Sequence, residues 1–201
     1  MRPLLLDRLR RETSDLHQAL EADLDLLRLE MTVEEYRRVL EGFYGFYAPW
    51  ETEVAGQVNG LLPRFNEERR KTPMLKRDLQ FLGSDLNSIP RCLTLPDTAS
   101  LLNILGSFYV LEGATLGGQL LSRHFFKQFA LSPAQGCCFF SSYGEQVGHR
   151  WQAFCNRLAA YSKPESDCRI VGAAKETFRV LSSWLDERVP KRATRLVGVF
   201  F

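Results

Sequence analysis

Three glycines interrupt a long apolar stretch of the chain, residues 106–126 (GSFYVLEGATLGGQLLSRHFF). The stretch has no proline, and its large apolar side chains recur at intervals that suit a helix. Gly113, Gly117 and Gly118 nevertheless lie inside it, and each interior glycine costs about 1 kcal/mol relative to alanine. A steric reason accounts for them: a group lies flat against this backbone, closer than a Cβ would allow. We therefore expect a helix whose glycine face borders a ligand.

The remaining sequence predicts further helices, since no segment shows sustained alternation of apolar and polar residues. Capping signals are Thr32 with Glu35, and Thr72 followed by Pro73. The first three expected helices cover residues 4–27, residues from 32 to a break at Gly60–Pro63, and residues 72–82. A fourth contains the glycine stretch and is capped by Asp97 or Thr98, a fifth runs from Ser141 or Ser142 to Pro164, and a sixth covers residues 165–188. Loops are expected at 83–96 and 132–140. The fold class is therefore all-α, and the aromatic segment 36–51 is expected in the core.

Length and composition favour one domain over residues 1–201, with a core at about 5–188 and a basic tail at 189–201 that contains Lys191, Arg192 and Arg195. A formal net charge of +2 argues against a nucleic-acid partner. No apolar run approaches the roughly 20 residues of a membrane span, and no signal peptide is evident. Five cysteines without a CxxC pair are typical of free thiols in a reducing cytosol, so we expect a cytoplasmic protein. We also expect it to be a monomer.

Histidine is the residue type that best explains a ligand site here. His17 lies beside the apolar stripe of the first helix, and Glu21 follows one turn later, where a carboxylate can orient a metal-bound imidazole. His124 and His149 have basic neighbours and are expected to be exposed. The chain has no HExxH, P-loop or GxGxxG motif and no pair of Glu-x-x-His motifs for a di-iron site. One histidine, a bare helix face and many aromatics suit a flat apolar macrocycle held between two helices.

Three segments together resemble the heme oxygenase family. TSDLHQALE (13–21) is similar to the family's proximal-helix signature, YRRVLEGFYGFYAPWE (36–51) to its aromatic second helix, and LEGATLGGQ (111–119) to its distal-helix signature. The distal variant resembles bacterial members that accompany bacteriophytochromes. The resemblance covers roughly residues 5–185, with the motifs in the family's order.

The resemblance implies a helical bundle with heme between the first helix and a glycine-kinked distal helix. It implies His17 as the axial iron ligand, supported by Glu21, and Gly113, Gly117 and Gly118 as the catalytic distal face. It also implies Arg10 as a propionate partner and, with a looser match, the region of Arg150 and Arg157. The family cleaves heme to biliverdin, CO and iron, using O₂ and electrons from a reductase or ferredoxin. The biliverdin would then supply a bacteriophytochrome.

Ala114 departs from the family pattern, because better-known members carry an Asp there that organises water for proton delivery. Ser14 likewise stands where a basic residue often lies. The departure keeps open a second hypothesis, a heme-binding or heme-delivery protein without turnover. A third is a non-heme protein of the same helical architecture, thiamin-degrading or di-iron, which would bind no heme.

Overall fold

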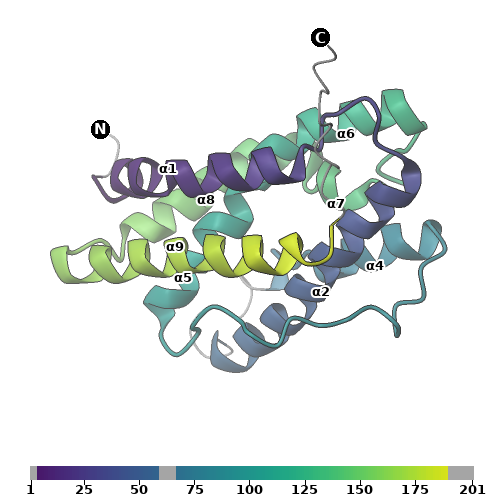
Figure 1. Ribbon diagram of the computed structural model, residues 1–201. Coiled ribbons are helices and arrows are strands. Elements are labelled where there is room, and N and C mark those ends of the chain that lie inside the picture. Colours follow the sequence, from purple (N-terminus) through teal and green to yellow (C-terminus); the bar gives the residue numbers. More distant parts are fainter. Residues whose placement is uncertain (1–3, 59–66, 190–201) are drawn as a thin grey trace, which may run out of the picture.

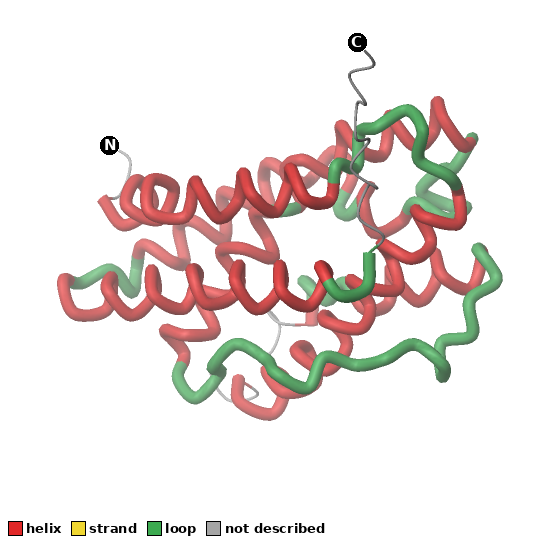
Figure 2. The backbone as a smooth tube through the Cα atoms, in the orientation of Figure 1, coloured by secondary structure: helices red, strands yellow, loops and turns green. Residues whose placement is uncertain are grey.

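The computed structural model describes residues 4–58 and 67–189, in which helices supply all the regular structure apart from isolated bridges near Ser132 (Figures 1 and 2). The all-α prediction is therefore confirmed for the described chain. The elements are α1 (Leu4–Leu24), α2 (Val33–Val58), α4 (Thr72–Phe81), α5 (Leu101–Gly113), α6 (Thr115–Phe129), α7 (Cys138–Ser141), the 3-10 turn η1 (Gly144–Gln146), α8 (Val147–Ala159) and α9 (Pro164–Asp186).

Helix α9 is the centre of the bundle, since it packs on α1 along one side and on α5 along another (Figure 1). The crossing with α5 is close because α5 carries Gly106 there. A Cβ at that position would lie 2.4 Å from the carbonyl oxygen of Ile170. Helix α9 also reaches α2, where the indole of Trp184 donates to the carbonyl of Gly42 at 2.7 Å.

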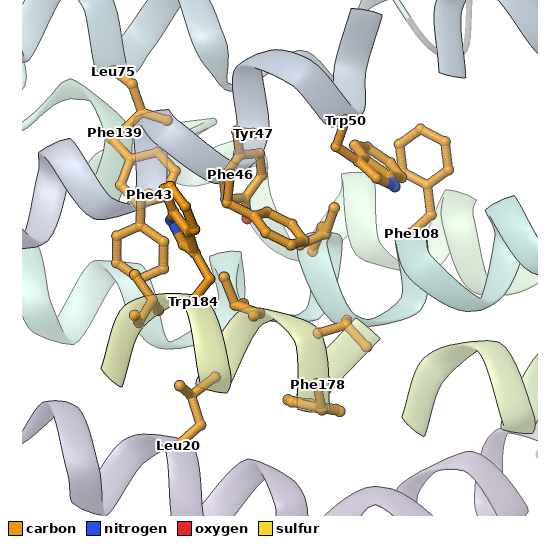
Figure 3. Packing of buried hydrophobic residues seen from close by; sticks show 14 of the residues in the cluster. Leu20, Phe43, Phe46, Tyr47, Trp50, Leu75, Phe108, Phe139, Phe178 and Trp184 are labelled. Carbon is orange, nitrogen blue, oxygen red and sulfur yellow. The ribbon is translucent and has the colours of Figure 1, made fainter. Parts of the chain in front are cut away.

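The core is rich in aromatic rings from α2, as the sequence predicts. Phe43, Phe46, Tyr47 and Trp50 are buried, and Figure 3 shows Trp184 of α9 beside Phe43. Trp50 meets Phe108 of α5 edge to face, with ring centroids 5.1 Å apart. These contacts fix α2 against α5 and α9, and α1, which carries His17, packs on α9.

Two predicted helix caps are wrong, and one is confirmed. Thr32 and Glu35 form the expected reciprocal capping box before α2. Thr72 does not cap α4; instead Glu51 of α2 accepts hydrogen bonds from the backbone N–H groups of Lys71 and Thr72. The cap of α5 is Ser100 rather than Asp97 or Thr98. In the case of α4, the distant carboxylate can satisfy the free N–H groups at the helix start better than the local hydroxyl.

The glycine stretch forms two helices rather than one. Helix α5 ends at Gly113 and α6 begins at Thr115, with Ala114 between them. The side chain of Thr115 donates to the carbonyl of Glu112 at 2.7 Å, a local bond of the kind that bends helices. The expected interruption of this helix therefore lies at the first of the three glycines.

The segment after α6 also differs from prediction. Residues 138–141 form the short helix α7 where a loop is expected, and α8 begins at Val147 rather than at Ser141 or Ser142. Ser142 has a left-handed backbone with φ of 46°, which stops the helix there. Asp78 of α4 accepts from the N–H groups of Cys138 and Phe139, both at 2.7 Å. This long-range cap starts α7, and no local pattern encodes it.

Smaller differences occur at helix ends. Helix α1 stops at Leu24 instead of residue 27, α8 stops at Ala159 instead of at Pro164, and α9 begins at Pro164 instead of residue 165. The predicted break at Gly60–Pro63 and the basic tail beyond Val189 lie outside the described residues. No helix in the described ranges is long and apolar enough to cross a membrane.

Candidate functional site

His17 lies on α1 with 52% of its side chain exposed, so a ligand can reach its ring. Its Nε2 is 3.4 Å from a carboxylate oxygen of Glu21, and the ring packs 5.8 Å from that of Phe178 on α9. A carboxylate at this position can orient a metal-bound imidazole. Among residues 4–58 and 67–189, no group of three or more His, Cys, Asp or Glu is arranged to bind a metal ion. The geometry suits His17 as an axial ligand to an iron held by a macrocycle.

Helix α6 presents an apolar strip that no other part of residues 4–58 and 67–189 covers. Leu116 and Leu120 are 47% and 57% exposed, although both are large apolar residues. Gly117 lies between them in the sequence and is also exposed, and a Cβ there would meet no atom of another described segment within 4 Å. Exposed apolar patches of this kind mark ligand sites or interfaces. The strip is the surface that a flat apolar ligand would cover.

A polar anchor joins the C-terminal end of α6 to the segment that follows α1. The side-chain amide of Gln128 donates to the backbone oxygens of Leu29 and Met31, at 2.7 and 3.0 Å. Along the rest of their lengths the two helices do not pack extensively on one another. The C-terminal end of α6 therefore contacts the loop that follows α1, while His17 and the apolar strip are both exposed.

The three glycines of the predicted distal face have different surroundings. A Cβ at Gly113 would lie 3.7 Å from the ring of Trp151, which is ordinary contact. A Cβ at Gly118 would lie 2.2 Å from the carbonyl oxygen of Phe140, so this glycine is required for the packing of α6 on α7. Gly117 has no such structural reason. Of the three, Gly117 is therefore the glycine whose missing side chain points most directly to a ligand.

The predicted propionate partners differ in their freedom. Arg10 is exposed on α1, about two turns before His17. Arg150 is instead held at the start of α8, where it donates to Glu68 at 3.1 Å and lies over the ring of Tyr143. The propionate-binding roles of Arg10 and Arg150 stay predictions. That of Arg157, which is exposed on α8, stays a prediction too.

The other two histidines differ from one another. His149 is exposed, as the sequence predicts. His124 is partly buried, and its Nε2 is shielded from solvent, so the expectation of an exposed side chain is wrong. Its position beside the ring of Phe125, with centroids 5.5 Å apart, explains the difference.

The sequence did not predict a buried charged cluster that lies next to the break in the glycine stretch. Glu112 ion-pairs with Lys71 and Arg69, and all three residues are at most 5% exposed. Tyr143 donates to the same carboxylate at 2.9 Å. One signal was present in the sequence: Glu112 is the single charged residue between Leu101 and Ser122. A lone charge inside an apolar helix needs a buried partner.

Asp78 gives a pH-dependent test of how α7 is held. Burial raises the pKa of Asp78 to about 6, although the N–H groups of Phe139 and Cys138 lower it in part. Since the folded pKa exceeds the unfolded value of 3.8, folding gains stability as pH falls through 6 and the buried carboxylate costs stability above it. We expect the wild-type free energy of unfolding, relative to that of Asp78→Asn, to rise by about 1 kcal/mol between pH 7 and pH 5.

Urea denaturation of both proteins at the two pH values measures this difference. A constant offset between the two proteins is expected in addition, because the amide can accept only with its single oxygen. A difference that does not change with pH, or one that shrinks on acidification, would contradict the raised pKa.

Comparisons with known proteins place this geometry in context. The family model described as heme oxygenase matches residues 4–187. A curated heme oxygenase of Xanthomonas campestris pv. campestris is 29% identical over 91 residues. That alignment covers 45% of this chain and spans about half, 52%, of the relative's length.

Solved structures show the same fold. A heme oxygenase from Neisseria meningitidis, solved with NO and CO bound, aligns with a TM-score of 0.78 at 20% identity and covers 94% of each chain. One from Leptospira interrogans aligns at 0.74 and 20% identity over 93% of this chain and 100% of its own. One from Synechocystis, in complex with heme, aligns at 0.69 and 21% identity over 91% of each chain.

Proposed function

Since this chain belongs to the heme oxygenase family, we propose that it cleaves heme to biliverdin, CO and iron. The observations that carry the proposal are an accessible histidine on α1 and an exposed glycine and leucine strip on α6. The reaction would use O₂ and electrons from a separate reductase or ferredoxin. Heme, when bound, supplies the iron that activates O₂ for attack on the macrocycle itself.

His17 would bind the iron from the side of α1. The ring lies near Glu21 and Phe178, and Glu21 would orient it when the iron is bound. A neutral imidazole donates less electron density to iron than a thiolate, which promotes O–O cleavage in enzymes of the P450 type. The histidine therefore suits a reaction that attacks the ring before the O–O bond breaks.

The strip on α6 would cover the opposite face of the macrocycle. Leu116 and Leu120 would exclude water from it, and Gly117 leaves room for a small molecule on the iron. Because no side chain stands at Gly117, the backbone alone would border the bound oxygen and steer it sideways toward the edge of the ring. Arg10, and more loosely Arg150, would pair with the propionates.

A heme-binding or heme-delivery function is the second candidate, and Ala114 favours it. Ala114 is exposed and offers no polar group for a chain of water molecules. The nearest acid in the sequence, Glu112, is buried and saturated by Lys71, Arg69 and Tyr143, so its carboxylate is not free to replace the missing Asp. Proton delivery would then depend on water held by backbone groups.

Turnover of bound hemin separates the two functions. We expect the purified protein to form a hemin complex with a Soret band, and then to lose that band with ascorbate or a reductase in air as a biliverdin absorption grows. Chromatography of the product identifies the biliverdin isomer, and a CO assay gives the second product. An intact spectrum that is only reduced or oxygenated would support heme delivery, and no Soret band at all would support the non-heme hypothesis. Transfer of the product to an apo-bacteriophytochrome would test the proposed recipient.

A further inference from the structure

Four side chains from three parts of the chain meet beneath the end of α5. Glu112 belongs to the last turn of that helix, Arg69 and Lys71 precede α4, and Tyr143 precedes η1. Glu112 and Lys71 are each 2% exposed, so the charges are removed from water. A cluster of this kind must be fully hydrogen-bonded to persist, because an unpaired buried charge costs several kcal/mol.

The hydrogen bonds of the cluster saturate both carboxylate oxygens. Oε1 of Glu112 accepts from Nζ of Lys71 at 2.7 Å and from the hydroxyl of Tyr143 at 2.9 Å. Oε2 accepts from the guanidinium of Arg69. Lys71 donates further to Tyr143 at 2.5 Å and to the carbonyl of Arg69 at 2.9 Å. The side chain of Glu112 therefore has one orientation, set by three neighbours.

Electrostatics explain why cations gather at this place. The C-terminal end of a helix carries a partial negative charge from its free carbonyls, and a carboxylate there is unfavourable by itself. Lys71 and Arg69 offset both the carboxylate and the end of α5. Replacement of such a cluster by apolar residues often leaves stability unchanged or higher, so bulk stability does not account for its presence.

The cluster acts on the backbone at the break in the glycine stretch. Glu112 is one residue before Gly113 and two before Ala114. Its side chain is fixed by the cluster, while its carbonyl accepts from the hydroxyl of Thr115 on α6. The side chain of Glu112 is thus hydrogen-bonded to the buried cluster, and its backbone carbonyl is hydrogen-bonded to Thr115, the first residue of α6. The direction in which α6 leaves α5 depends on these two attachments.

We infer that Glu112 is a positioning residue: with Lys71, Arg69 and Tyr143 it fixes the bend at Ala114 and hence the placement of Gly117 over the bound substrate. The inference rests on the proposed function for its consequence, the choice of the ring edge that is attacked. The other part, that the cluster makes the backbone around residues 113–118 rigid, holds whether or not the protein cleaves heme. The two parts are therefore testable apart.

Hydrogen exchange of the ligand-free protein tests the rigidity. We expect Glu112→Gln to raise amide exchange at residues 113–118 by about tenfold or more, with little change in α1. Tyr143→Phe, which leaves every charge in place, should give a smaller change in the same segment. Ser107→Ala is the control, because it removes a buried hydrogen bond from α5 to Thr177 at 2.8 Å without touching the cluster. It should leave residues 113–118 protected.

The C–O stretch of the ferrous CO complex and the ratio of biliverdin isomers test the consequence. Glu112→Gln and Tyr143→Phe are expected to shift both, whereas Ser107→Ala retains the wild-type values. If exchange at 113–118 is unchanged in both cluster variants, or rises equally in Ser107→Ala, the inference is overturned. If exchange rises but the CO complex and isomer ratio stay the same, the assignment of Glu112 as a positioning residue fails. If the wild type forms no hemin complex, the proposed function fails, while the exchange result still decides the first part.

Discussion

Replacement of His17 by alanine is expected to abolish the histidine-ligated spectrum of the hemin complex and to lower turnover by at least about 100-fold. The axial nitrogen is lost, and changes in the groups that merely orient such a ligand already cost about 10–100-fold. The free energy of unfolding should change by less than about 0.5 kcal/mol, because the side chain is 52% exposed and only the edge of the core at Phe178 loses a contact. Absorption and resonance Raman spectra of the ferric complex measure the ligation.

One companion variant and one rescue experiment make the His17 result specific. His149→Ala removes an exposed histidine from α8 and should leave the spectrum unchanged. Added imidazole should restore part of the ligation in His17→Ala, since it supplies the missing nitrogen from solution. If His17→Ala keeps an unaltered histidine-ligated spectrum, the candidate ligand becomes His124, which is partly buried.

Gly117→Ala and Gly118→Ala are expected to have opposite effects, although the two residues are adjacent. Alanine at 118 places a Cβ 2.2 Å from the carbonyl oxygen of Phe140, which should destabilise the fold by about 2–3 kcal/mol. Alanine at 117 meets open space, and its better helix propensity should stabilise the fold by up to about 1 kcal/mol. In exchange, the new methyl group stands on the face where we place the substrate and should lower hemin turnover by about tenfold.

Denaturation midpoints and hemin turnover of the two variants measure these effects together. Each variant is the matched control of the other, because the chemical change is the same and the positions are consecutive. Wild-type turnover in a stabilised Gly117→Ala protein would remove Gly117 from the substrate face. An unaltered stability of Gly118→Ala would show that α7 can retreat from α6.

Much of the fold could be read from local patterns. Helical periodicity indicated the helices, the aromatic run of α2 indicated the core, and the Thr32–Glu35 box fixed the start of α2. These features depend on residues within one or two turns of each other, so sequence spacing is enough to reveal them. The resemblance of three short motifs gave the family, which the match over residues 4–187 bears out.

Three of the failures share one physical cause, which is hydrogen bonding between residues far apart in the chain. Asp78 starts α7 from 60 residues away, and Glu51 caps α4 from 20 residues away. Neither partner is visible in the local sequence, so the predicted caps were the nearest suitable hydroxyls. The buried cluster around Glu112 was missed for the same reason, since its cations lie about 40 residues earlier.

The glycine stretch shows what the sequence determines and what only the tertiary structure determines. The sequence by itself determined that residues 106–126 are apolar, helical and weakened by glycines, because those properties belong to the residues. Only the tertiary structure decided what each glycine is for. Gly106 and Gly118 admit neighbouring backbones of α9 and α7, whereas Gly117 faces open space beside exposed leucines. Steric demand at a glycine is set by what packs against it, and that is fixed only when distant segments come together.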